Sequence, residues 1–245
     1  MTAEPSIPTD ERRRIVRDGV AVGVASGAYG VSFGALGVAA GLSVTQTCVM
    51  SLLMFTGASQ FAMVGVVAAG GPALSGSLTA LLLGSRNTLY GLRMKPLLGW
   101  HGWRRTAAAQ LLIDESTAMS VNRDTRAAAR VGFLSTGIAV FVLWNLATFL
   151  GALAGRSIGN PKAYGLDAAV GGAFLALLWP RLKAPRNRVL GLLAAAVALG
   201  VVPVTKAGIP VLVASIVALV AGVVLRGADP TEFPSGHDGH EGRTR

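Results

Sequence analysis

The 245-residue chain has a formal net charge of +10, yet only 14% of its residues are charged and 52% are hydrophobic. Soluble domains average about 25% charged residues, and a nucleic-acid-binding protein would carry such an excess as a basic face on a polar surface. With a mean hydropathy of +0.56, the chain has too little polar surface for either class.

The chain begins with a polar segment, residues 1–18, that includes four arginines. No Asp, Glu, Lys or Arg then occurs between Asp18 and Arg86. Because roughly 18 uncharged apolar residues already indicate a membrane span, this gap predicts an integral membrane protein. We expect an all-α fold, a polytopic helical bundle of roughly 6–8 transmembrane segments in which glycine-rich helices are broken or re-entrant.

Apolar segments follow one another along the rest of the chain. They cover residues 19–41, 44–70, 72–92, 106–120, 131–155, 163–179, 189–204 and 207–225. We expect a single transmembrane domain over residues 19–225. A polar cytoplasmic segment, residues 1–18, precedes it, and a tail without periodic apolar pattern, residues 226–245, is expected to be disordered.

Basic residues in short loops orient membrane proteins, because such loops stay in the cytoplasm. The basic residues at 181–188 and 12–17 therefore predict that both termini lie in the cytoplasm and that the protein resides in the cell membrane. Three simple spans from residue 19 to residue 92 would instead place the basic stretch 93–105 outside. Either segment 106–120 crosses and that stretch is an exception, or a glycine-rich segment bends back without crossing.

Glycines repeat at intervals of three or four residues along the first apolar segment. They are Gly19, Gly23, Gly27, Gly30, Gly34, Gly37 and Gly41. Such spacing lines one helix face with hydrogen atoms and favours tight helix packing. The alternative is a glycine-hinged, discontinuous helix at a transport site, with Tyr29 and Ser32 as candidate polar contacts.

A polar motif interrupts the middle of the second apolar segment. Gly57, Ala58, Ser59 and Gln60 lie there between two phenylalanines. A half-helix that starts near Ser59 would present free N–H groups and a positive dipole end to a carboxylate. The alternative is a hydrogen-bonded cluster that holds helices together, since unpaired polar groups are costly in a bilayer.

Charged side chains occur at two further places among apolar residues. Arg86 is followed by Asn87 and Tyr90, and Asp114 is followed by Glu115. An arginine at depth marks a pathway or a paired charge, and one of the two acids would meet Arg86 or line a cavity and take up a proton. The alternatives are an arginine that snorkels to the head groups and an interfacial helix whose acids lie in water.

The remaining polar residues give weaker indications. Asp167 lies four residues into its apolar segment and is a lesser candidate. His101, His237 and His240 lie in a loop and in the tail, and Cys48 is the single cysteine, so no intramembrane metal site is predicted. With no Walker A sequence and no arrangement of nucleophile and base, we expect neither an enzyme nor a bound cofactor.

Taken together, these motifs resemble the AzlC family, the large subunit of two-component branched-chain amino-acid exporters. The motifs are residues 55–61, residues 83–91, Asp114-Glu115-Ser116, and residues 165–167 followed by 174–178. The resemblance extends over residues 19–225. It implies export of valine, leucine or isoleucine, and a hydrophobic AzlD-type partner subunit.

The sequence therefore supports two hypotheses. In the first, the chain is a secondary transporter that holds a small aliphatic amino acid with residues 57–60, completed by Arg86, Asn87 and Tyr90. Asp114 or Glu115 would act as charge partner or proton acceptor. In the second, the chain is a non-transporting membrane scaffold whose glycine faces exist for packing against a partner.

Overall fold

The computed structural model describes residues 7–157, 175, 178–179, 181–205 and 209–226. This part of the chain is helical and contains no strand, which confirms the all-α character of the predicted fold. Its helices are α1 (Thr9–Gly27), α2 (Tyr29–Ala39), α3 (Val44–Leu53), α4 (Gly57–Ala68), α5 (Ala73–Gly84), α6 (Arg86–Leu98), α7 (Gly102–Gln110), α8 (Asp114–Val121), α9 (Arg126–Ser157), α11 (Pro185–Val201) and α12 (Ile209–Arg226). Asp167, most of segment 163–179 and the tail beyond residue 226 lie outside the described residues.

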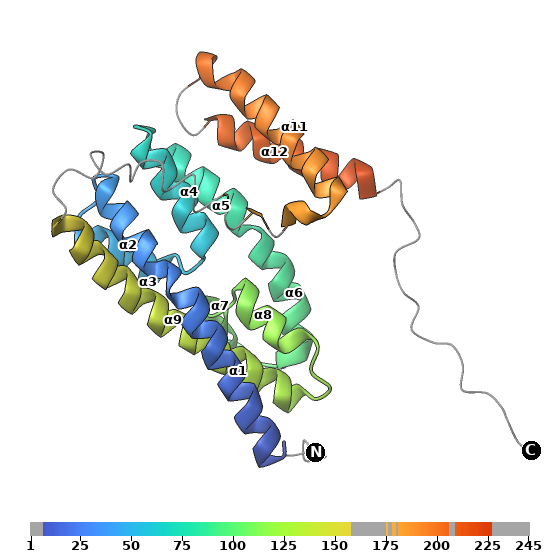
Figure 1. Cartoon of the computed structure of the whole chain (residues 1–245). Helices are drawn as coiled ribbons and strands as arrows, with labels where there is room; N and C mark the ends of the chain where they lie inside the picture. The colour runs from blue at the N-terminus through green and yellow to red at the C-terminus, as the bar shows by residue number, and fades with distance from the viewer. Residues whose placement is uncertain (1–6, 158–174, 176–177, 180, 206–208, 227–245) are drawn as a thin grey trace, which may run out of the picture.

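Three helical stretches in the described part are long and apolar enough to cross a membrane. They are Thr9–Ala39, which joins α1 to α2, Arg126–Ser157, which is α9, and Pro185–Val204, which contains α11. α11 packs against α12, and α12 contacts α5 (Figure 1). These lengths confirm a helical membrane protein.

The glycines of the first segment form the contact between α1–α2 and α9. A Cβ placed on Gly19 would lie 2.6 Å from Ser135 Oγ, and one placed on Gly27 would lie 2.7 Å from the Cβ of Leu143. Positions in both helices advance together, so α1–α2 runs parallel to α9. At Ala28, between α1 and α2, the backbone keeps helical angles (φ −56°, ψ −32°). The glycines therefore serve tight packing of a nearly continuous helical stretch against α9.

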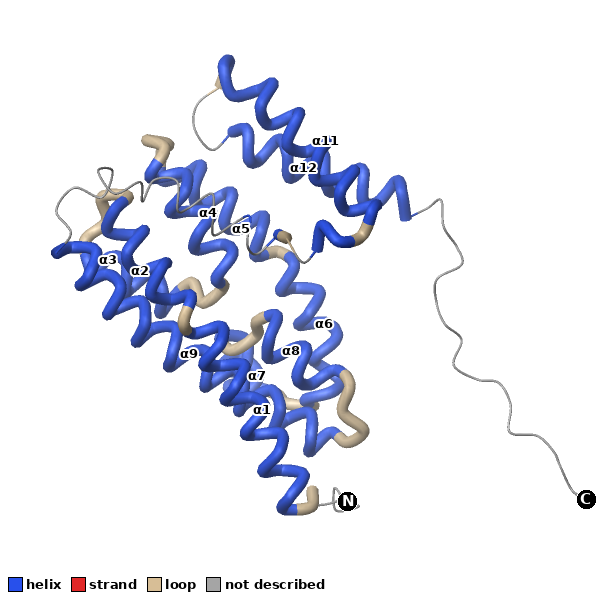
Figure 2. The backbone as a smooth tube through the Cα atoms, in the orientation of Figure 1, coloured by secondary structure: helices blue, strands red, loops and turns tan. Residues whose placement is uncertain are grey.

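α3 and α4 form a re-entrant hairpin. Near the end of α3, Ser51 donates a hydrogen bond to Thr148 Oγ1 of α9 (3.4 Å). At the tip, Gly57 lies against Trp144, one helical turn closer to the start of α9. α4 then returns toward the end of the bundle from which α3 came (Figure 2). The chain enters the bundle and leaves it again on the same side.

α7 and α8 form a second re-entrant hairpin, which enters from the opposite end. Leu111, just after α7, lies against Gly137 of α9. Along α8 the backbone at Met119 lies against Gly132, nearer the start of α9 (Figure 1). The two tips meet near the middle of α9, where the side-chain amide of Gln110 donates a hydrogen bond to the carbonyl of Leu52 (2.7 Å).

α5 and α6 together run through the bundle, antiparallel to α9. At the end of α6, the carbonyl of Leu98 accepts a hydrogen bond from Arg130 Nε, near the start of α9 (2.7 Å). The basic stretch 93–105 therefore lies at the same end of the bundle as the arginines of 12–17. The path of the chain agrees with the predicted alternative in which a segment bends back, and segment 106–120 bends back as well.

Candidate functional site

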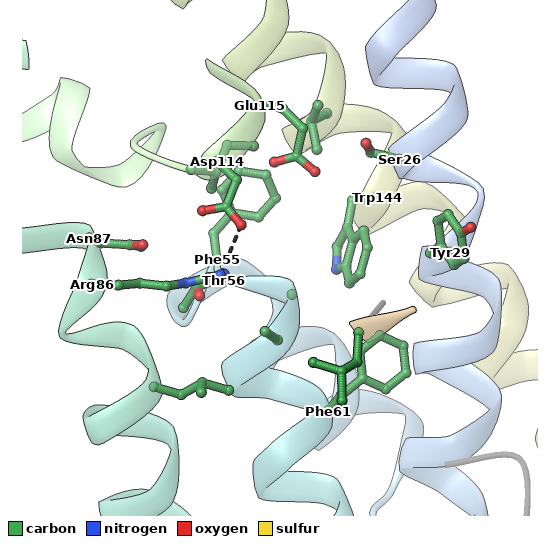
Figure 3. A pocket seen from close by; sticks show the side chains of 16 residues that line it. Ser26, Tyr29, Phe55, Thr56, Phe61, Arg86, Asn87, Asp114, Glu115 and Trp144 are labelled. Carbon is green, nitrogen blue, oxygen red and sulfur yellow. Dashed lines mark ion pairs between the residues drawn. The ribbon is translucent and has the colours of Figure 1, made fainter. Parts of the chain in front are cut away.

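A cavity of about 330 Å³ lies where the two hairpin tips meet (Figure 3). Its wall is formed by α1–α2, by both tips, by the α5–α6 junction and by the middle of α9. Its polar lining residues are Ser26, Tyr29, Thr56, Arg86, Asn87, Asp114 and Glu115, and its apolar ones include Phe55, Phe61, Leu83, Ile113, Val140 and Trp144. The cavity therefore combines charged groups with an aromatic and aliphatic surface.

An ion pair joins α6 to the second hairpin at this cavity. Arg86 Nη1 lies 2.9 Å from Asp114 Oδ2, and the two side chains are 28% and 35% exposed. Arg86 is the first residue of α6, directly after Ser85, and Asp114 is the first residue of α8. A carboxylate at a helix N-terminus is favoured by the helix dipole. Of the two adjacent acids, Asp114 is therefore the one that meets Arg86.

The start of α4 forms the facing side of the cavity. α3 ends at Leu53, and α4 begins at Gly57, two residues before the predicted position near Ser59. Thr56 is the N-cap residue, and no side chain in the described part of the chain caps this end. Gly57 and Ala58 line the cavity. Their N–H groups belong to the first turn, which has no intrahelical acceptor, so this wall favours an anionic group.

Gln60 fixes the geometry of the first tip. It is completely buried, and its amide nitrogen donates to the carbonyls of Ser51 (3.2 Å) and Met54 (2.6 Å) at the end of α3. Its amide oxygen accepts a hydrogen bond from Trp144 Nε1 (3.0 Å). The carbonyl of Met54 also accepts from the N–H of Thr56 (2.8 Å), so Gln60 adds a second donor there. Gln60 also gives a partner to the carbonyl of Ser51 near the end of α3, and it attaches the tip to α9.

Replacement of Gln60 by leucine should destabilise the protein by at least about 2 kcal/mol, because the carbonyl of Ser51 and the indole N–H of Trp144 lose the partner that Gln60 provides. The control is Gln46→Leu, at an exposed amide that accepts from the N–H of Ser43 and should cost about 1 kcal/mol or less. Both free energies of unfolding are measured by denaturant titration in mixed micelles. Equal losses in the two variants would contradict the role assigned to Gln60.

The residues predicted to bind substrate or to serve as charge partners fall into two groups. Those that line the cavity are Gly57, Ala58, Arg86, Asn87, Asp114 and Glu115. Those that do not line it are Ser59, Gln60 and Tyr90. Asn87 also connects α6 to the second tip, since its amide nitrogen donates to the carbonyl of Leu112 (3.2 Å).

A family comparison bears on the same region of the chain. The family model described as "AzlC protein" matches residues 21–158, more than half of the chain. The chain belongs to the AzlC family. A relative in Helicobacter pylori, named "Uncharacterized membrane protein", is 25% identical over 177 residues, which is 70% of this chain and 77% of that protein. No solved structure matches.

The region matched to the AzlC family contains the complete core of the site. It includes α1 from residue 21 onward and all of α2 to α9, hence both hairpins and every cavity-lining residue except Leu178. Trp144 is a member of this lining that the sequence analysis did not single out. The available signal was a tryptophan with an indole N–H in the middle of a 25-residue uncharged segment, where its polar group requires a partner.

Proposed function

We propose that this AzlC-family membrane protein is a secondary transporter that exports branched-chain or other small aliphatic amino acids. The proposed substrates are valine, leucine and isoleucine. In this proposal the chain is the large subunit of a two-component system. The observation that carries the proposal is the charged cavity between the hairpin tips. Its volume of about 330 Å³ lies at the small end of the roughly 300–1,000 Å³ typical of ligand pockets.

The chemistry of the cavity supports a zwitterionic aliphatic substrate. A carboxylate group is matched by the first turn of α4 and by Arg86, and an ammonium group by the acids at the start of α8. An aliphatic side chain is matched by the apolar wall that includes Phe61, Val140 and Trp144. Polar groups at this depth are expensive in a bilayer and commonly mark a substrate pathway.

The arrangement of the hairpins supports alternating access. Secondary transporters commonly bind substrate near the bilayer midplane, between discontinuous helices of inverted repeats. Here each through-running element, α1–α2 or α5–α6, is followed by a hairpin, and the two sets run in opposite directions. Displacement of one hairpin would open the cavity to one end, and displacement of the other would open it to the opposite end.

The distribution of basic residues supports an orientation. The end of the bundle that carries the arginines of 12–17 and the stretch 93–105 is rich in Lys and Arg. By the positive-inside rule, this end lies in the cytoplasm. The cavity would then load amino acid from the cytoplasm when the second hairpin, α7–α8, is displaced.

The scaffold hypothesis loses its main support. It attributes the glycine faces to packing against a partner, whereas Gly19, Gly27 and Gly34 pack on α9 of the same chain. The hypothesis also provides no reason for an ion pair and a second carboxylate around an internal cavity.

The proposal is tested by counterflow of labelled leucine in proteoliposomes that contain this chain with and without its AzlD-type subunit. We expect exchange in at least one of these preparations and none in protein-free liposomes. Labelled glutamate, whose second carboxylate has no matching cation in the apolar wall, serves as the control substrate and should not exchange. Absence of leucine exchange in both preparations would reject the proposed function.

A further inference from the structure

The two adjacent acids at the start of α8 have different surroundings. Asp114 forms the ion pair with Arg86 at 2.9 Å. Glu115 also lines the cavity, but within the described part of the chain its carboxylate forms no ion pair and no side-chain hydrogen bond. One acid is therefore committed to a fixed cation, and the other is available to a ligand.

The geometry of α8 separates the two carboxylates. Consecutive residues on an α-helix point about 100° apart. Figure 3 shows Asp114 on the side of Arg86, and Glu115 on the side of Ser26 and Trp144. The Glu115 carboxylate thus faces the part of the cavity between α8, α1 and α9, away from the ion pair.

The charges around the cavity do not balance. Its ionic lining residues within the described part are one cation, Arg86, and two anions, Asp114 and Glu115. An anion partly removed from water is costly unless it is paired. The N-terminal dipole of α8 offsets part of this cost at Glu115. A cationic group of a bound ligand would offset the rest of the cost of removing the Glu115 carboxylate from water.

We infer that Glu115 binds the ammonium group of the substrate, whereas Asp114 is the fixed counter-ion that positions Arg86. This inference rests on the proposed transport of amino acids. It assigns a different role to each of the two carboxylates. The carboxylate of the substrate then faces the first turn of α4 at Gly57 and Ala58. The aliphatic side chain of the substrate lies along the apolar wall that includes Phe61, Val140 and Trp144.

The test compares leucine with 4-methyl-2-oxopentanoate, which has the same carbon skeleton and a keto group in place of the ammonium group. Both compounds compete with labelled leucine in counterflow by the complete two-subunit protein. In the wild type, leucine should compete at least 10-fold better than the oxo acid, because Glu115 attracts the ammonium group and repels an unbalanced anion.

Glu115→Gln should weaken competition by leucine about 10- to 100-fold, the effect of a lost charge-assisted hydrogen bond, and should not weaken competition by the oxo acid. The preference between the two compounds would therefore collapse. The matched control is Asp18→Asn, the same chemical change at an exposed ion pair with Arg17, and it should retain the wild-type preference. Asp114→Asn should weaken both compounds together, because it releases Arg86.

The possible outcomes separate this inference from the proposed function. Equal weakening of leucine and oxo acid by Glu115→Gln, with leucine exchange intact in the wild type, would overturn the role of Glu115 and leave the transport function standing. Equal competition by the two compounds in the wild type would overturn it without any variant. Absence of exchange in the wild type would remove the proposed function itself.

Discussion

Arg86→Gln is expected to lower the initial rate of leucine counterflow about 100-fold. Loss of one partner from a buried ion pair costs about 3–5 kcal/mol. Because the side chains of Arg86 and Asp114 are 28% and 35% exposed, water screens part of the interaction, and we expect about 2–3 kcal/mol here. The remaining Asp114 charge would also repel the carboxylate of a substrate. The measurement is the exchange rate per reconstituted protein.

The double variant Arg86→Gln with Asp114→Asn distinguishes a stability effect from a transport effect. With both charges removed, the free energy of unfolding should recover most of the loss, but the exchange rate should stay low. Arg17→Gln is the matched control, since its ion pair with Asp18 is exposed, and this variant should exchange leucine as the wild type does. Wild-type exchange by Arg86→Gln would show that the ion pair is not part of the transport site.

Gly34→Ala is expected to destabilise the protein by about 3 kcal/mol and to abolish leucine exchange. A Cβ at this position would overlap the carbonyl oxygen of Thr148 and lie 2.7 Å from the backbone nitrogen of Ala152. Both obstacles are backbone atoms, which cannot rotate away as a side chain can. α2 would have to move from α9, at the upper end of the usual cost of overpacking, and the cavity wall at Tyr29 would move with it.

Gly200→Ala in α11 is the control for this prediction. A Cβ there meets no atom within 4 Å, and alanine is favoured over glycine in a helix interior by about 0.5–1 kcal/mol. The unfolding free energy of this variant should therefore equal or exceed that of the wild type. If Gly34→Ala were as stable as Gly200→Ala, the close contact between α2 and α9 would be absent from the folded protein.

Several parts of the site could be predicted because polar groups are rare and costly at this depth. The helix break before Gly57 and the pairing of Arg86 with Asp114 follow from the requirement that such groups find partners. So apolar a chain has few polar side chains that could serve as partners, so the number of possible pairings between them is small. A helix start near Ser59 and a meeting of Arg86 with one of the two acids were predicted in this way, and the structure has the helix start at Gly57 and the ion pair with Asp114.

The paths of the hairpins could not be predicted by the same reasoning. Hydropathy shows that segments 44–70 and 106–120 are apolar and interrupted. The hydropathy of a segment is the same whether the chain crosses the bundle after the interruption or turns back. The direction depends on tertiary contacts, such as the one from Gln110 to Leu52. Gln60 agrees with the alternative of a hydrogen-bonded cluster that holds helices together, but its partners on α3 and α9 could not be named from the sequence.

The short hairpin helices have a consequence for how the protein is made. α3 has 10 residues and α4 has 12, so at about 1.5 Å per residue they measure about 15 and 18 Å. Neither reaches across a hydrocarbon layer of about 30 Å, and α9, on which their tip rests, is synthesised more than fifty residues later. During biogenesis the first hairpin must therefore wait at or near the membrane surface, and it reaches its final depth only after α9 has been inserted. Substrate-binding geometry would then be a late event in the maturation of this protein, and translation arrested before α9 would yield an inserted but inactive chain.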